Sequence, residues 1–75
     1  MSHLPHLSGQ ELIKHLAKFG FQVVRIKGSH ACIKKLSVNP PIVAIVPLHD
    51  EIKVGTLKSI LRQTKISEED FMNIF

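Results

Sequence analysis

Residues 21–36 have the sequence FQVVRIKGSHACIKKL, in which two runs of strand-forming residues flank a Gly-Ser pair. The first run, Phe21–Lys27, is rich in β-branched side chains, which favour strands. Gly28 and Ser29 suit the two central positions of a tight hairpin turn. Residues 30–36 therefore predict a second strand that returns antiparallel to the first.

A third strand is predicted after a proline-rich turn. Residues 37–41 end in an Asn-Pro-Pro triplet, which prevents regular pairing, and residues 42–46 form the most apolar run of the chain. A hairpin whose turn is centred just after Asn39 sets His30 opposite about position 49. We therefore expect His30 and His49 at the same end of the sheet.

Helical patterns lie on both sides of the strands. Ser8 and Glu11 have the spacing of a capping box, and they predict a helix over residues 9–19. Apolar residues at positions i, i+3 and i+4 predict a second helix over residues 54–65. Ser67 then begins a short last turn. The side chains expected in the core are Leu12, Leu16, Ile45, Leu57 and Leu61.

The predicted order of elements is α-β-β-β-α, in a single domain that spans residues 1–75. A three-stranded antiparallel sheet with one apolar face must be covered on that face, and two helices can do so. The predicted fold class is therefore α+β, with the layout of a double-stranded-RNA-binding domain. Such a layout does not by itself assign a function.

The composition narrows the class of protein. A chain of 75 residues, 44% of them hydrophobic, fits one compact domain and argues against disorder. The formal net charge of +4 favours polyanionic partners weakly. Because Trp and Tyr are absent, an RNA ligand would be held mainly through its backbone rather than by base stacking.

The single cysteine, Cys32, excludes an internal disulfide and a Cys-rich zinc site. Its apolar neighbours predict a buried, inert thiol, which fits a reducing cytoplasm. No apolar run reaches the roughly 20 residues of a membrane span. Residues 1–7 lack the basic segment and apolar core of a secretion signal. We therefore expect a cytoplasmic protein that does not contact a membrane.

Six short motifs together resemble those of one family. They are SGQEL at 8–12, GF at 20–21, KGSH at 27–30, VPLH at 46–49, GTLKSILRQ at 55–63 and ISEEDF at 66–71. Their order and spacing resemble the HicA (YcfA-like) family, the toxin half of a toxin–antitoxin pair. The resemblance implies an mRNA-cleaving ribonuclease, with His30 of KGSH as its catalytic residue and a HicB-like antitoxin as its inhibitor. The apolar turn at 38–41 departs from the family, where this turn is more often polar.

The chemistry of RNA cleavage fits these residue types. RNA carries its own nucleophile, the 2′-hydroxyl, so cleavage needs a proton acceptor, a proton donor and positive charge near the phosphate. Histidine suits proton transfer because its ordinary pKa of about 6.5 is close to neutral pH. The acidic residues are few and scattered, so we expect no metal site and no cofactor.

His49 is the second catalytic candidate. It would share the proton transfers with His30 or orient the phosphate. The alternative is a structural role, in which His49 forms a hydrogen bond that holds the loop at Asp50. The other histidines carry no comparable signal: His3 and His6 lie in a loose N-terminal segment, and His15 is expected on the exposed side of the first helix.

The candidate RNA-binding residues lie on the predicted hairpin beside His30 or on the second helix. Gly55 leaves backbone N–H groups at the start of that helix open to a phosphate. After Gly55, Lys58 and Arg62 lie four residues apart, and Lys65 lies three residues further on. These three side chains form a basic ridge along the helix. The full set is Lys27, Ser29, Lys34, Gly55, Lys58 and Arg62.

Three classes of function remain open. The first is a metal-independent endoribonuclease toxin, which the resemblance favours. The second is a non-catalytic RNA-binding module, in which His30 only touches a 2′-hydroxyl or a phosphate. The third is a protein-interaction domain whose basic face meets an acidic partner. For the first class we expect a monomer by itself, and a hetero-oligomer in which the antitoxin covers His30 and presents acidic side chains to the basic ridge.

Overall fold

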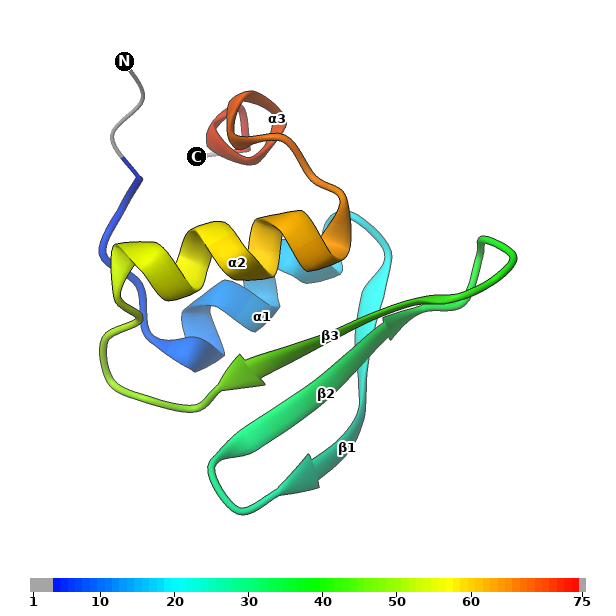
Figure 1. The fold of residues 1–75 in the computed structure, drawn as a ribbon, viewed down its shortest axis with the longest axis horizontal. Coiled ribbons are helices and arrows are strands. Elements are labelled where there is room, and N and C mark those ends of the chain that lie inside the picture. The colour runs from blue at the N-terminus through cyan, green and yellow to red at the C-terminus, as the bar shows by residue number, and fades with distance from the viewer. Residues whose placement is uncertain (1–3, 75) are drawn as a thin grey trace.

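The computed structural model describes residues 4–74, which form three helices and three strands (Figure 1). The elements are α1 (Gly9–Ala17), β1 (Phe21–Lys27), β2 (His30–Lys35), β3 (Ile42–Pro47), α2 (Val54–Thr64) and α3 (Glu68–Met72). The strands form one antiparallel sheet in the order β1-β2-β3. Figure 1 shows α1 and α2 together on one side of this sheet. The predicted α+β class and its α-β-β-β-α order are confirmed.

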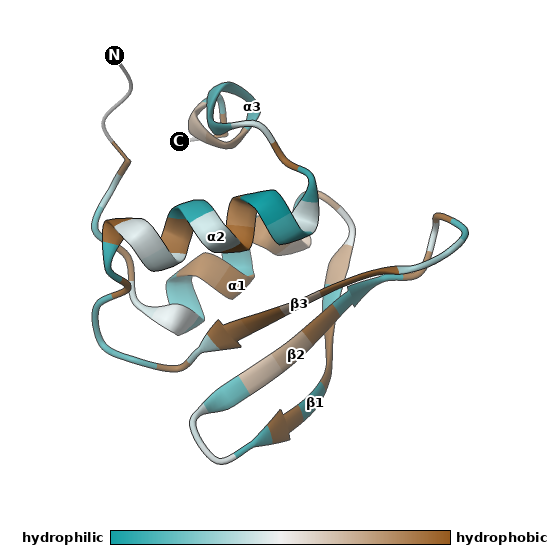
Figure 2. Cartoon of the chain, viewed as in Figure 1, coloured by the Kyte–Doolittle hydropathy of each residue, from teal (hydrophilic) through white to brown (hydrophobic). Residues whose placement is uncertain are grey.

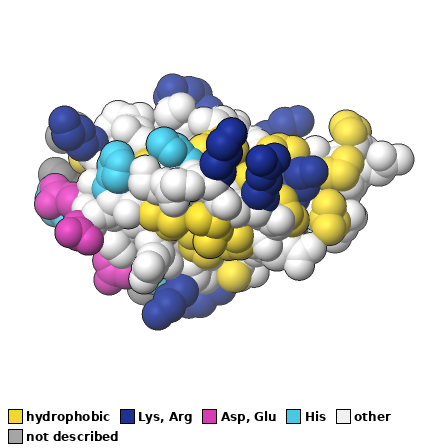
Figure 3. Space-filling view, turned by 90° about the horizontal axis from the view of Figure 1, so that it is seen from below, with side chains coloured by type: hydrophobic (Ala, Val, Ile, Leu, Met, Phe, Trp, Pro, Cys, Tyr) yellow, Lys and Arg dark blue, Asp and Glu magenta, His cyan; other side chains and the backbone are white. Residues whose placement is uncertain are grey.

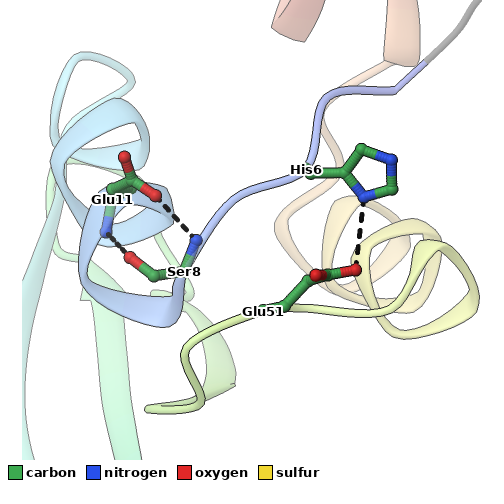
Figure 4. Close-up of polar contacts among 4 residues, drawn as sticks. All are labelled: His6, Ser8, Glu11 and Glu51. Carbon is green, nitrogen blue, oxygen red and sulfur yellow. Dashed lines mark hydrogen bonds and ion pairs between the residues drawn. The ribbon is translucent and has the colours of Figure 1, made fainter.

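The start of α1 is fixed by the predicted capping box (Figure 4). The Glu11 N–H donates to the Ser8 hydroxyl at 3.1 Å, and the Ser8 N–H donates to the Glu11 carboxylate at 2.9 Å. The hydrogen bonds from the Ser8 backbone N–H and side chain lower the pKa of the Glu11 carboxyl. Leu7 and Leu12, the two positions of the hydrophobic staple, both lie in the core.

The β1–β2 hairpin has the two-residue turn that its sequence predicts. Lys27 pairs with His30, which leaves only Gly28 and Ser29 in the turn. Gly28 has a φ of 59°, a left-handed conformation that is strained for any residue with a Cβ. The Gly-Ser pair therefore fixes the position of His30 at the first residue of β2.

The core lies between the sheet and the helices. Its largest fully buried side chains come from all three helices and from two strands: Phe71, Leu12, Leu16, Ile33, Leu57, Ile60 and Val46. The predicted core residues Leu12, Leu16, Leu57 and Leu61 are confirmed, because each is at most 2% exposed. Phe71 of α3 is also buried, so the short last helix seals the core.

The prediction that Ile45 is a core residue is wrong. Its side chain is 43% exposed, whereas its neighbours Ala44 and Val46 are fully buried. Alternate residues of a strand face opposite sides of a sheet, and β3 is hydrophobic along its whole length (Figure 2). A run without alternating polarity does not reveal which residues face the helices. The small Ala44 takes the inner position.

The predicted β2–β3 register is wrong by two residues. His30 pairs with Pro47, not with position 49, and the loop runs from residue 36 to residue 41. The prediction assumed a tight turn just after Asn39. Proline cannot adopt the positive φ that tight hairpin turns require, so Pro40 cannot occupy a central position and a longer loop forms.

Two expectations about burial are corrected. His15 is half-buried rather than exposed, and its ring meets Phe71 edge-on, with ring centroids 6.4 Å apart. Cys32 is a free thiol, but it is only half-buried, because it follows the buried Ala31 and therefore points to the opposite face of the sheet. Of the two N-terminal histidines, His3 lies outside the described residues.

The burial pattern predicts the cost of core truncation. Leu16→Ala and Leu61→Ala should each lower the free energy of unfolding by about 2–5 kcal/mol, because each leaves a cavity. Ile45→Ala is the matched control, and it should cost less than either core variant because its side chain is half in solvent. Urea denaturation measures all three. Equal losses for Ile45→Ala and Leu61→Ala would contradict this assignment of the core.

Candidate active site

The face of the sheet that no helix covers within residues 4–74 carries three of the eight candidate residues, Lys27, His30 and Lys34. The register assigns to this open face the side chains that alternate with the buried ones: Gln22, Arg25, Lys27, His30, Cys32, Lys34, Val43, Ile45 and Pro47. Figure 3 shows the molecule from below, which is the side away from the helices in Figure 1. Hydrophobic side chains gather in the middle of this surface, and basic side chains and histidines lie beside them. We call these nine residues the open face.

His30 lies at the end of the open face, between its two cross-strand partners. It pairs with Lys27 on β1 and with Pro47 on β3. Directly opposed residues of antiparallel strands have Cβ atoms about 4.5–5.5 Å apart. His30 is exposed. An exposed imidazole with a lysine beside it can contact a phosphate and exchange protons with it.

Ser29 and Lys34 flank His30 along the chain. The Ser29 carbonyl accepts a hydrogen bond of 2.6 Å from the Leu48 N–H, which joins the hairpin turn to the end of β3. Lys34 is four residues along β2 on the same face, about 13 Å from His30 at the usual rise of a strand. Lys27 and Lys34 are thus on one surface with His30, and Ser29 lies in the turn directly before it.

His49 lies in the loop between β3 and α2, and hydrogen bonds join this loop to the start of α1. The His49 carbonyl accepts a hydrogen bond from the Gly9 N–H at 2.9 Å, and the Leu7 carbonyl accepts one from the Ile52 N–H at 2.7 Å. An exposed ion pair joins Glu51 to His6 at 3.3 Å (Figure 4). The His49 side chain is exposed and lines a hollow with residues of this loop and of α2: Pro47, Glu51, Ile52, Lys53 and Thr56.

Gly9 allows this close approach between α1 and the His49 loop. A Cβ at position 9 would overlap the carbonyl oxygen of Pro47 and lie 2.8 Å from the Leu48 Cα. Both of these obstacles are backbone, which cannot move aside as a flexible side chain can. The loop therefore needs glycine at this position. The sequence predicts Gly9 only as the first residue of a helix, and this role is not evident from it.

The start of α2 faces the same hollow. Its N-cap residue, Lys53, forms no side-chain capping hydrogen bond, and Thr56 of the first turn lines the hollow beside His49. Nothing lies within 4 Å of a Cβ built on Gly55, so this turn is open to solvent. Gly55 was predicted from the sequence, whereas Lys53 and Thr56 were not, because only the folded loop brings them next to His49.

Lys58 and Arg62 lie on another part of α2. They line a second hollow with Lys65 and with the start of α3, including Ser67 and Glu68. Residues of an α-helix are rotated by about 100° per position, so these two side chains point well away from Gln63. Gln63 faces the sheet, because its side-chain oxygen accepts a hydrogen bond of 3.3 Å from the Ile45 N–H. The basic ridge and the open face are therefore separate surfaces.

Within residues 4–74, no three His, Cys, Asp or Glu side chains are grouped so that they could hold a metal ion. No helix in the same range is long and apolar enough to cross a membrane.

Comparison with known proteins gives one match. A family model described as the HicA toxin of bacterial toxin–antitoxin systems matches residues 9–66, which is most of the chain. The chain belongs to the HicA toxin family. No curated protein and no solved structure matches it. Membership of a HicA toxin family implies a toxin role and, in general terms, an antitoxin partner.

The region that the family model matches contains the whole candidate site. Residues 9–66 begin at Gly9, the glycine that lets α1 approach the His49 loop, and they include the whole sheet and α2. His30, His49 and every candidate RNA-binding residue lie within this HicA region. Phe71, which seals the core, lies beyond it.

The close approach at Gly9 predicts opposite effects for two glycine substitutions. Gly9→Ala should destabilise the fold by about 1–3 kcal/mol, because the methyl group overlaps backbone atoms of Pro47 and Leu48. Gly55→Ala is the matched control at the start of the other long helix, and it should be neutral or stabilising by up to about 1 kcal/mol. Thermal unfolding measures both. If Gly9→Ala is as stable as the wild type, the loop does not depend on this contact.

Proposed function

We propose that this HicA-family chain is a metal-independent endoribonuclease that cleaves mRNA with His30 as a catalytic residue. The observation that carries the proposal is the position of His30 on the open face, exposed and paired with Lys27. The chain has no acidic residue between Glu11 and Asp50, so the entire sheet presents only basic or neutral side chains. Such a surface attracts the RNA backbone.

The proposed reaction uses the RNA's own 2′-hydroxyl. The 2′-oxygen attacks the adjacent phosphorus as it loses its proton, and the bond from phosphorus to the 5′-oxygen breaks as that oxygen gains a proton. The products are a 2′,3′-cyclic phosphate and a 5′-hydroxyl end. His30 takes part in one of these two proton transfers, and Lys27 stabilises the negative charge that develops on the phosphate.

His49 is proposed as the group for the other proton transfer. The loop that carries it follows directly after Pro47, the cross-strand partner of His30. The hydrogen bond from the Gly9 N–H to the His49 carbonyl holds this loop against α1 and limits its movement. The hydrogen bond that holds the loop comes from the backbone carbonyl of His49, which supports a role for its side chain in proton transfer over the structural alternative.

The RNA is proposed to lie across the open face. Lys27, Ser29 and Lys34 then contact the backbone around His30, and the first turn of α2 at Gly55 offers N–H groups to a neighbouring phosphate. Lys58 and Arg62 form a second contact on the other surface of α2. The antitoxin, of the HicB type, inhibits by covering His30, and the toxin alone is a monomer.

The strongest competing function is an RNA-binding module without catalysis. The observation that favours it is the extent of the open face, whose cations reach well beyond His30 to Lys34. In this alternative His30 only contacts a phosphate or a 2′-hydroxyl. Cleavage by the purified chain distinguishes the two functions.

Substitution of His30 tests the proposed mechanism. His30→Ala should reduce cleavage by about 10²- to 10⁴-fold, the usual effect of a positioned acid or base. The fold should persist because the side chain is exposed at the end of a turn, and RNA binding should persist because the lysines remain. Gln10→Ala, at an exposed position of α1 outside the open face, is the control and should keep full activity. His49→Ala should fall between the wild type and His30→Ala if both histidines transfer protons.

The assay uses antitoxin-free chain, an RNA oligonucleotide and EDTA. A single 2′-deoxy substitution at the cleaved position should abolish cleavage, because the nucleophile is then missing. Loss of wild-type activity in EDTA, together with full activity of His30→Ala, would refute the mechanism. RNA binding without any cleavage by the wild-type chain would favour the non-catalytic module.

Salt dependence tests the contribution of α2 to RNA binding. Lys58→Glu with Arg62→Glu should weaken binding and flatten its dependence on salt concentration, because fewer counterions are released. Lys14→Glu with Lys18→Glu makes the same charge change on α1 and its C-cap residue, and it is the matched control. If the α2 variant has the same salt slope as the wild type in a binding titration, the ridge does not contact RNA.

A further inference from the structure

The two outer edges of the sheet differ. On β3, Pro47 has no N–H, and the Ile45 N–H donates to the Gln63 side chain at 3.3 Å. α2 therefore covers this edge around Ile45. On β1 every residue after Phe21 is exposed, and within residues 4–74 β1 has a neighbouring strand on one side only. β1 is the open edge of the sheet.

The backbone of β1 offers unpaired groups at this edge. The two-residue turn makes Lys27 and His30 a hydrogen-bonded pair. In an antiparallel ladder the next residue, Ile26, then directs its N–H and C=O away from β2. Such a row of free groups is a template for another strand. The register shift at Val24 interrupts the row, so pairing is available on either side of it.

The side chains along this edge are of two kinds. Val23, Val24 and Ile26 are 40%, 43% and 59% exposed, which is unusual for large apolar residues of one short strand. Arg25 and Lys27 lie on the open face, whereas Ile26, which pairs with the buried Ala31, lies on the other face. The outer half of β1 is thus apolar on one face and basic on the other.

We propose that β1 binds an extended segment of the antitoxin, and that acidic residues alternate with apolar residues in this segment. The partner itself rests on the proposed function. The docked strand would pair with the free backbone groups around Ile26. Its acidic side chains would lie beside Arg25 and Lys27, and its apolar side chains would cover Val23 and Ile26.

Charge argues against the other occupants of this edge. A second copy of the chain would bring Arg25 and Lys27 against the same residues, and no acidic residue between Glu11 and Asp50 is available to offset them. Like charges directly opposite each other destabilise a pair of strands. RNA would satisfy the cations, but it would leave the apolar side chains in water. An acidic, apolar strand satisfies all three features of the edge.

The docked strand would act on the active site through Lys27. Neighbouring strands lie about 4.8 Å apart, so a strand on β1 would be about 10 Å from His30, with Lys27 between them. Its acidic side chains would pair with Lys27 and remove that lysine from the phosphate. The edge therefore anchors the antitoxin beside His30 while another part of the antitoxin covers the histidine.

The experiment measures the affinity of the chain for its antitoxin, without RNA. Ile26→Pro removes the outward N–H and no bond to β2, and it should weaken binding about 2- to 10-fold more than Ile26→Ala, which keeps the N–H. Arg25→Glu should weaken binding about tenfold or more, and Lys14→Glu, with the same charge change on α1, should have little effect. If Ile26→Pro does not fold, Arg25→Glu and the exchange measurement below decide.

Hydrogen exchange of the backbone amides locates the contact. The Ile26 amide should exchange quickly in the isolated chain and at least tenfold more slowly in the complex. Equal exchange in both states, or no binding to the antitoxin, would overturn the proposal. Protection that rises with the concentration of the isolated chain would overturn it in favour of self-association. Cleavage of RNA by the isolated chain is a separate measurement, so failure of this proposal is distinct from failure of the nuclease function.

Discussion

A three-stranded sheet with only two long helices can bury one of its faces, and this constraint organises the whole molecule. α1 and α2 cover the face that carries Ala31, Ile33, Ala44 and Val46. The other face therefore remains open to solvent or to a ligand. It carries lysines, His30 and half-exposed apolar side chains.

The positions of the two candidate catalytic histidines depend on the ends of the strands. His30 begins β2, and His49 follows the end of β3, so both depend on where the turns place the chain. The Gly28-Ser29 turn fixes the first position. The second depends on the contact between Gly9 and the Pro47–His49 backbone, in which the start of a helix binds a loop 40 residues away in the sequence. The stability of α1 and the geometry of the candidate site are therefore coupled.

The two edges of the sheet differ in whether they can pair with another strand. On β3, proline and Gln63 leave no free donor for another strand at Ile45 and Pro47. On β1, the interruption at Val24 and the cations at 25 and 27 limit indiscriminate pairing, which is a common protection of edge strands. Those cations still favour an acidic strand over a second basic copy.

Local sequence signals determined the elements and their order. The capping box at Ser8 and Glu11, the Gly-Ser turn and the helical repeat after residue 54 act over a few residues, so each could be interpreted without a fold. They were sufficient for the α+β class, for four of the five expected core residues and for the position of His30 at the start of a strand. The motif resemblance to the HicA family also rests on sequence alone, and the family model confirms it.

Only the tertiary structure decided how these elements meet. The uniformly apolar run at 42–46 has no alternation, so its inward face depends on the helices that pack against it, and these select Ala44 and Val46 over Ile45. The β2–β3 register depends on a six-residue loop whose prolines exclude a tight turn. The need for glycine at position 9, the hollow around His49 and the separation of Lys58 and Arg62 from the open face all arise between segments distant in sequence. Long-range packing determines such contacts, and no local pattern of residues encodes them.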